Sequence, residues 1–211
     1  MYTSNTYKID KKINVYMILL SLYCVALVVS NIISNRTFNI GQFMLPSAVI
    51  VFPIIYIIND VLTECYGFKM ATKAIWTAFG LNLMAVMFFN IAVNLPTTTD
   101  YSSYNIVLGN TLKPLVASVV AYLIGSFINA KIMDVLRNHK SLMLRCVLST
   151  LFGETIDAAI FISIMFIGVM DLCVVCTMII SQAVVKTLYE IVVYPITKKV
   201  INTIKSIEVG A

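Results

Sequence analysis

Long apolar stretches separated by short polar segments run through the whole chain. Six of these stretches meet or approach the about 20 residues that a helix needs to cross a hydrocarbon core roughly 30 Å thick. They cover residues 15–33, 48–62, 74–93, 115–130, 147–169 and 174–194. The second is short, because Pro53 and then Asn59 and Asp60 interrupt it. The pattern predicts an all-α protein, a polytopic bundle of six transmembrane helices.

The overall composition excludes most soluble classes of protein. Of the 211 residues, 60% are hydrophobic and 12% are charged, and the mean hydropathy is +0.92. Soluble domains usually contain about 45–50% apolar residues. A disordered chain, a secreted disulfide scaffold and an ordinary cytosolic enzyme are therefore excluded. No polar segment is long enough for a separate domain, so we expect residues 1–211 to form one transmembrane domain. The first stretch is longer than a signal-peptide core and no A-x-A site follows it, so we expect it to remain in the mature protein.

The distribution of lysine and arginine predicts the orientation in the membrane. Of 15 such residues, 12 lie in the two terminal segments and in the second and fourth connections. Arg36 and Lys113 lie in the other connections, and Lys186 lies inside the sixth stretch. Because cations collect in cytoplasmic loops, both termini should be cytoplasmic, and the net charge of +5 needs no nucleic acid to explain it. This topology also allows a three-plus-three inverted repeat, with the second and fifth stretches as counterparts.

Six ionisable residues fall where lipid would otherwise surround the chain, two on each of three stretches. They are Asp60 and Glu64, Glu154 and Asp157, and Lys186 and Glu190. Spacings of three or four residues place each pair on one helix face. Charges at membrane depth are costly and normally mark a pathway or a binding site.

Their positions along the helices suggest a common depth. Asp60, Glu154 and Glu190 each lie 8 or 9 residues from the nearest predicted cytoplasmic cation, or roughly 12–14 Å at 1.5 Å per residue. One shared, acidic cavity is therefore our hypothesis. Two alternatives stay open: Glu64 is an interfacial charge at a helix end, or Lys186 pairs with Asp157 or Glu154 in a purely structural network.

Polar, aromatic and small residues extend the pattern. Asn31, Asn59, Phe52 and Tyr56 are candidates to complete the cavity, although buried amides also bond helices together. On the fourth stretch, Ala117, Ala121 and Gly125 are spaced four residues apart, which favours close packing either inside the bundle or between protomers.

The five cysteines suggest neither a disulfide framework nor a metal centre. Cys173 and Cys176 form the C-x-x-C of the chain, and neither a second cysteine pair nor a histidine accompanies them. We expect no metal and no cofactor, and leave any role of this pair open.

Two long runs resemble a known family. They are FPIIYIINDVLTECYG at 52–67 and STLFGETID at 149–157, together with Ser30, Asn31 and Lys186. Over essentially its whole length the chain resembles the queuosine precursor transporter family, also called YhhQ-like or VUT. The resemblance implies a multi-pass, non-enzymatic protein of the bacterial cytoplasmic membrane. It further implies import of 7-deazaguanine bases (preQ0, preQ1 or queuine) for tRNA modification.

The residues fit such a cargo. Carboxylates accept paired N–H donors from a guanine-type edge, and aromatic rings stack on its face. We expect Asp60, Glu154 and Asp157 to bind the base, and Lys186 to neutralise one carboxylate or to contact the base carbonyl. The further candidates for the substrate site are Asn31, Asn59, Phe52, Tyr56, Glu64 and Glu190. The expected partners are this small molecule and the lipid bilayer, without nucleic acid; proton coupling, homo-oligomers and an energising partner stay open.

Two other functions deserve comparison. The substrate-binding subunit of a multi-component vitamin importer is similar in size, but a clear A-x-x-x-A for docking its partner is missing from the first stretch. An intramembrane hydrolase could use Asp60 and Asp157 as a proton-sharing pair. The G-x-G-D setting of such enzymes is absent, because Glu154 follows Gly153.

Overall fold

The computed structural model describes residues 2–33, 36–40, 43–96, 108, 112–138 and 141–209. Within these residues, six α-helices are long and apolar enough to cross a membrane, if the 3₁₀ turn η1 is counted with α2. This confirms the predicted all-α helical bundle. The helices are α1 (Tyr2–Ile33), α2 (Phe52–Tyr66), α3 (Phe68–Val93), α5 (Leu112–Val135), α6 (Leu142–Phe166) and α7 (Leu172–Val209).

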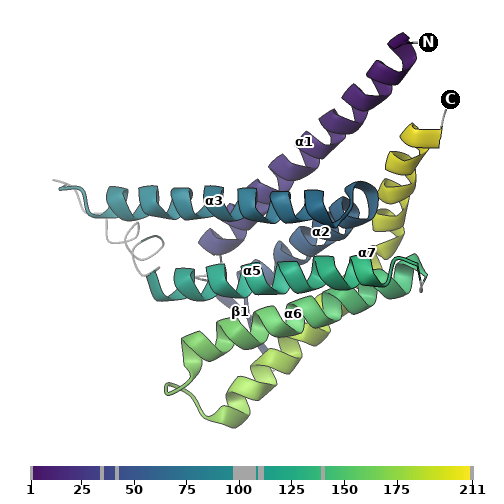
Figure 1. Ribbon diagram of the computed structural model, residues 1–211. Coiled ribbons are helices and arrows are strands. Elements are labelled where there is room, and N and C mark those ends of the chain that lie inside the picture. The colour runs from purple at the N-terminus through teal and green to yellow at the C-terminus, as the bar shows by residue number, and fades with distance from the viewer. Residues whose placement is uncertain are drawn as a thin grey trace.

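Successive helices run in opposite directions, as Figure 1 shows. Both termini lie at one end of the bundle, on the same side as the α2–α3 junction. The α6–α7 connection and the end of α3 lie at the opposite end. The side of the membrane that each end faces remains a prediction from the lysine and arginine count.

A small β-hairpin precedes α2, where the sequence indicated only a connection. Strand β1 (Thr37–Ile40) pairs antiparallel with β2 (Phe43–Pro46), with Ile40 opposite Phe43. The 3₁₀ turn η1 (Ser47–Ile50) follows and leads into α2. Ala48 and Val49 in this turn are buried, so the entry to α2 packs against the bundle.

Helix α2 is the most enclosed segment of the bundle. Of its 15 residues, 11 are buried. Pro53 lies in the first turn, where its fixed φ and missing N–H suit a helix start rather than breaking the helix. Gly67 ends the helix with φ 82°, a conformation that side chains rarely tolerate, and its N–H donates to the Thr63 carbonyl over 3.0 Å. The polar residues of this helix are therefore presented to protein.

Several predicted boundaries were too narrow. The second segment was predicted to end at residue 62, whereas α2 continues to Tyr66 with Asp60 inside it. The sixth was predicted to end at 194, whereas α7 continues past Pro195 to Val209. A helix satisfies its own backbone hydrogen bonds, so it can extend beyond its apolar part into polar surroundings.

Glycines allow α5 and α6 to approach closely. A Cβ added at Gly153 would lie 2.8 Å from Asn129 Cβ and 2.9 Å from the Gly125 carbonyl oxygen. A Cβ at Gly125 would lie 2.9 Å from Asp157 Cβ. Ala117 and Ala121 on the same face as Gly125 are fully buried. The small-residue pattern of the fourth span thus serves packing inside the bundle.

Candidate functional site

All six predicted membrane-depth charges lie inside the protein. Glu154, Asp60 and Glu190 are 0% exposed, and the remaining three are at most 5% exposed. None faces lipid, which fulfils the condition for a buried polar site. They do not form one cavity, however, but three groups that follow one another along α2.

The first group surrounds Lys186 of α7. Its ammonium forms an ion pair with Glu154, lies 3.3 Å from Asp157 Oδ2, and is 4.6 Å from the centroid of the Phe52 ring. Glu154 and Asp157 are three residues apart on α6, so they face the lysine from one side. The lysine therefore pairs with both acids rather than with one, and the group has a formal charge of −1.

This group retains acceptors for a ligand. Within the described part of the chain, Glu154 Oε1 and Asp157 Oδ1 are buried and have no hydrogen-bond partner. A buried acceptor without a partner costs free energy, and a ligand that donates to it removes this cost. The arrangement favours a ligand that carries N–H or O–H donors.

A pocket opens beside Lys186. Its volume is about 40 Å³, well below the roughly 300–1,000 Å³ of small-molecule sites, so the surrounding helices would have to move apart to admit a base. Most of its wall is apolar or aromatic, and a few polar groups converge on it. It is lined by Asn31, Ala48, Val49, Phe52, Ser118, Asp157, Phe161, Gln182 and Lys186.

Asn31 is held in place by a chain of hydrogen bonds across three helices. Its Nδ2 donates to Asn82 Oδ1 on α3 over 2.9 Å, and its Oδ1 accepts from Ser118 Oγ on α5 over 2.7 Å. The side chain is thus both a connection between helices and part of the pocket wall. The sequence had left these two roles as alternatives.

Two polar lining residues escaped the sequence analysis. Gln182 lies four residues before Lys186, and this spacing on one helix face could have identified it. Ser118 had no such signal, because its place in the pocket depends on how α5 packs against α1. Phe161, by contrast, lies one turn after Asp157 on the face already singled out.

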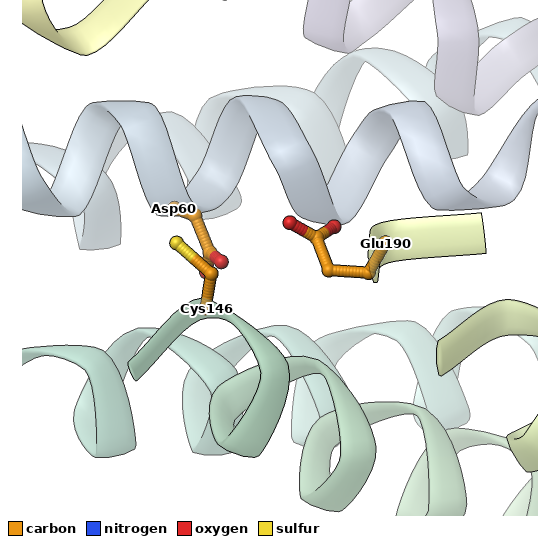
Figure 2. Close-up of side chains that lie close together, drawn as sticks. All are labelled: Asp60, Cys146 and Glu190. Atoms are coloured by element: carbon orange, nitrogen blue, oxygen red, sulfur yellow. The ribbon is translucent and has the colours of Figure 1, made fainter. Parts of the chain in front are cut away.

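The second group joins Asp60, Cys146 and Glu190, from α2, α6 and α7. One carboxylate oxygen of each acid and the cysteine sulfur lie within 4.8 Å of one another, and Figure 2 shows the Glu190 carboxylate facing the other two side chains. Ser149 Oγ lies 3.2 and 3.3 Å from the two Asp60 oxygens. Asp60 thus belongs to this second group, and the residues that line the pocket beside Lys186 do not include it.

Asn59 and Tyr56 fill the interface between α2, α5 and α6. Asn59 Nδ2 donates to Asn129 Oδ1 over 2.7 Å and to the Ser126 carbonyl over 3.1 Å. The Tyr56 hydroxyl donates to the Gly153 carbonyl over 3.5 Å. Both contacts are buried and hold helices together, and neither residue lines the described pocket.

The third group centres on Glu64, near the C-terminal end of α2. Arg145 Nη1 lies 2.5 Å from Glu64 Oε2, and Nη2 lies 3.3 Å from Oε1. Lys205 forms a second ion pair, and Arg137 donates to the Glu64 carbonyl over 2.6 Å. Glu64 is 4% exposed, so its carboxylate is buried between helices although it lies near the end of α2.

Membrane-length helices with buried charges and a small pocket between them are typical of membrane transporters. Comparison with protein families agrees. Residues 46–200 match the family described as "Putative vitamin uptake transporter", and the chain belongs to this family. The match begins at the end of the β-hairpin and includes all three charged groups except Lys205. No curated protein and no solved structure matches the chain.

Proposed function

We propose that the chain imports a 7-deazaguanine precursor of queuosine across the cytoplasmic membrane and binds it in the Lys186 pocket. The observation that carries this proposal is the pair of buried, unpartnered acceptors, Glu154 Oε1 and Asp157 Oδ1, beside an aromatic pocket. A guanine-type edge presents adjacent N–H donors, which carboxylates accept. Membership of a vitamin uptake family supports transport of a small heterocycle.

The pocket offers a matching group for each part of a flat, bicyclic base. Asp157 accepts the N–H donors, and Lys186 donates to the ring carbonyl while it offsets the charge of Glu154. Phe52 and Phe161 provide faces for stacking. The net formal charge of −1 also suits an aminomethyl cargo, whose ammonium adds one positive charge.

Alternating access around this pocket completes the proposed transport cycle. Phe52, Asp157 and Lys186 belong to three different helices, so a relative movement of α2, α6 and α7 would open or close the site. In this proposal, Asp60 and Glu64 support the helices next to the site rather than contact the base. The remaining candidates, Asn59, Tyr56 and Glu190, act in the same way.

Uptake of radiolabelled preQ1 by the purified protein in liposomes tests the proposal. Wild-type protein should accumulate the base, and unlabelled preQ0 or queuine should compete if they share the site. Asp157→Asn should lower uptake by about ten- to a hundredfold, since a hydrogen bond to a charged group contributes roughly 1.5–3 kcal/mol. Asp171→Asn is the matched control, because Asp171 is exposed before α7.

The outcomes separate the parts of the proposal. Unchanged uptake by Asp157→Asn would refute the binding site. Absence of binding of all three bases to wild-type protein would refute the substrate. Binding without uptake by the isolated protein would favour the substrate-binding subunit of a multi-component importer, which needs an energising partner.

A further inference from the structure

Within the part of the chain that the structure describes, the Asp60, Cys146 and Glu190 group has no ion-paired cation, whereas the other two groups do. Lys186 offsets the pocket acids, and Arg145 and Lys205 offset Glu64. Among the described residues, no lysine, arginine or histidine forms an ion pair with Asp60 or Glu190. Two carboxylates that face each other in a protein interior carry a formal charge of −2, which is costly without a positive charge between them.

Among the described residues, the immediate surroundings supply a hydrogen bond to Asp60 but no ion pair to either acid. Ser149 lies within hydrogen-bond distance of Asp60, and Asn129 of α5 lies in the same layer, bonded to Asn59. Arg145, next to Cys146 in sequence, forms its ion pair with Glu64. The helices packed around the group therefore leave its acidic side chains uncompensated.

Glu190 provides an independent sign of a ligand. It is 0% exposed, and neither of its carboxylate oxygens has a hydrogen-bond partner in the described part of the chain. Its carboxylate nevertheless points toward Asp60 and Cys146 (Figure 2). A fully buried carboxylate directed at another acid and a thiol has the position of a ligand to a shared cation.

We propose that Asp60, Cys146 and Glu190 bind a divalent cation of borderline softness, with Zn²⁺ as the representative ion. Two carboxylate oxygens and one sulfur are donors that Zn²⁺ accepts, and a water completes the four positions. The sulfur argues against Mg²⁺ and Ca²⁺, which prefer oxygen. Binding converts the Cys146 thiol to the thiolate and releases its proton, which leaves the group with a formal charge of −1 instead of −2.

The spacing of the donors suits such an ion after small side-chain rotations. Bonds of about 2.0–2.3 Å place neighbouring ligand atoms roughly 3–4 Å apart, close to the separations within 4.8 Å in the structure. The ion would link α2, α6 and α7 at a point separate from the pocket. Glu190 lies one turn after Lys186 on α7, so the ion would also fix the orientation of the helix that carries the pocket lysine.

Metal titration of tag-free, chelator-treated protein tests this site without any substrate. The exposed thiols Cys173 and Cys176 are first replaced by serine, because they could bind metal themselves. Zn²⁺ is titrated against a chromogenic chelator, and Co²⁺ is then used to detect sulfur-to-metal charge-transfer absorption. We expect one equivalent of ion per chain and a clear cobalt–sulfur band.

Single substitutions test whether the metal ion binds at Asp60, Cys146 and Glu190. Cys146→Ser should abolish the cobalt–sulfur band, and Glu190→Gln should weaken binding by more than tenfold. Ser149→Ala should weaken it by about 10- to 100-fold, the usual effect of losing a group that orients a ligand. Cys24→Ser, at another buried thiol, should leave both signals unchanged. Size-exclusion profiles and tryptophan-monitored unfolding confirm that each variant is folded.

The titration and the variants can each refute the metal site. Absence of stoichiometric binding in the parent protein would overturn the proposal and would leave protons to neutralise the two acids. A cobalt–sulfur band that survives Cys146→Ser would also overturn it. Because these measurements need no base, a failure of preQ1 uptake leaves the metal proposal intact, and loss of metal binding leaves the uptake test intact.

Discussion

Asp60 and Glu64 lie one turn apart on α2, both are buried, and both lie close to residues of α6 and α7. Glu64 meets two cationic side chains, and both of its oxygens are occupied. Asp60 meets a serine, a thiol and another carboxylate. Two carboxylates on one face of α2 thus differ: Glu64 is neutralised by cations and connects helices, whereas the charge of Asp60 has no cationic partner among the described residues. Their partners, and not their burial, therefore distinguish the two acids.

The largest effect should follow from removing the satisfied acid. Glu64→Gln leaves the buried Arg145 without a counter-charge, and breaking a buried ion pair in this way typically costs about 3–5 kcal/mol. We expect a strongly reduced yield of folded protein and a large drop in the thermal unfolding midpoint in detergent. Normal stability of this variant would contradict the structural role assigned to Glu64.

Replacing the pocket acid Asp157 should weaken ligand binding strongly and stability only slightly. Asp157→Asn keeps the shape of the side chain and leaves Lys186 its ion pair with Glu154. Binding of preQ1, measured by calorimetry, should weaken by about ten- to a hundredfold, while the unfolding midpoint changes much less than for Glu64→Gln. Equal losses of stability in the two variants would remove the distinction between the two regions.

Adding a methyl group at Gly153 should disturb the packing between α5 and α6, whereas adding one at Gly80 of α3 should not disturb packing. Gly153→Ala places a Cβ 2.8 Å from Asn129 Cβ and should cost about 1–3 kcal/mol through overpacking. Gly80→Ala in α3 is the control, since nothing lies within 4 Å of its Cβ and alanine favours a helix by about 1 kcal/mol. Unfolding in detergent should therefore move in opposite directions for the two variants.

The smallest effect should come from the hydrogen bonds that hold Asn31. Ser118→Ala removes the donor to Asn31 Oδ1, and such bonds between membrane helices contribute about 0.6 kcal/mol on average. The expected change in unfolding is correspondingly small. Thr77→Ala, which loses a bond within its own helix, provides a comparison, and a loss above about 2 kcal/mol for Ser118→Ala would indicate a larger network.

Much of the fold was predictable because lipid imposes simple rules. A helix in hydrocarbon must be long, apolar and internally hydrogen-bonded, so long apolar stretches of sequence can be recognised as membrane helices. Helix ends were less predictable, as α2 and α7 show, because polar surroundings also permit helix. The hairpin of β1 and β2 was missed, since two four-residue strands have no strong pattern of their own.

The burial of the six charges was also predictable, but their division into three groups was not. Six buried charges were identified from their cost in a membrane, and all six are inside. The similar depth of the acids in the membrane suggested one cavity. The depth of a residue along its helix, however, does not tell which neighbouring helix its side chain faces. Arg145 illustrates the difficulty: as a neighbour of Cys146 in sequence it could have approached either acid group, and its side chain pairs with Glu64.

By itself, the sequence determined that this chain has six membrane-length helices and that six ionisable residues must be hidden from lipid. These conclusions depend on length, composition and transfer free energy, which are properties of each segment alone. Only the tertiary structure decided which charges meet, because ion pairs form between helices far apart in the chain. The rotation and packing of α2, α6 and α7 therefore assigned Lys186 to the pocket, two cations to Glu64, and none to Asp60 and Glu190 within the described residues.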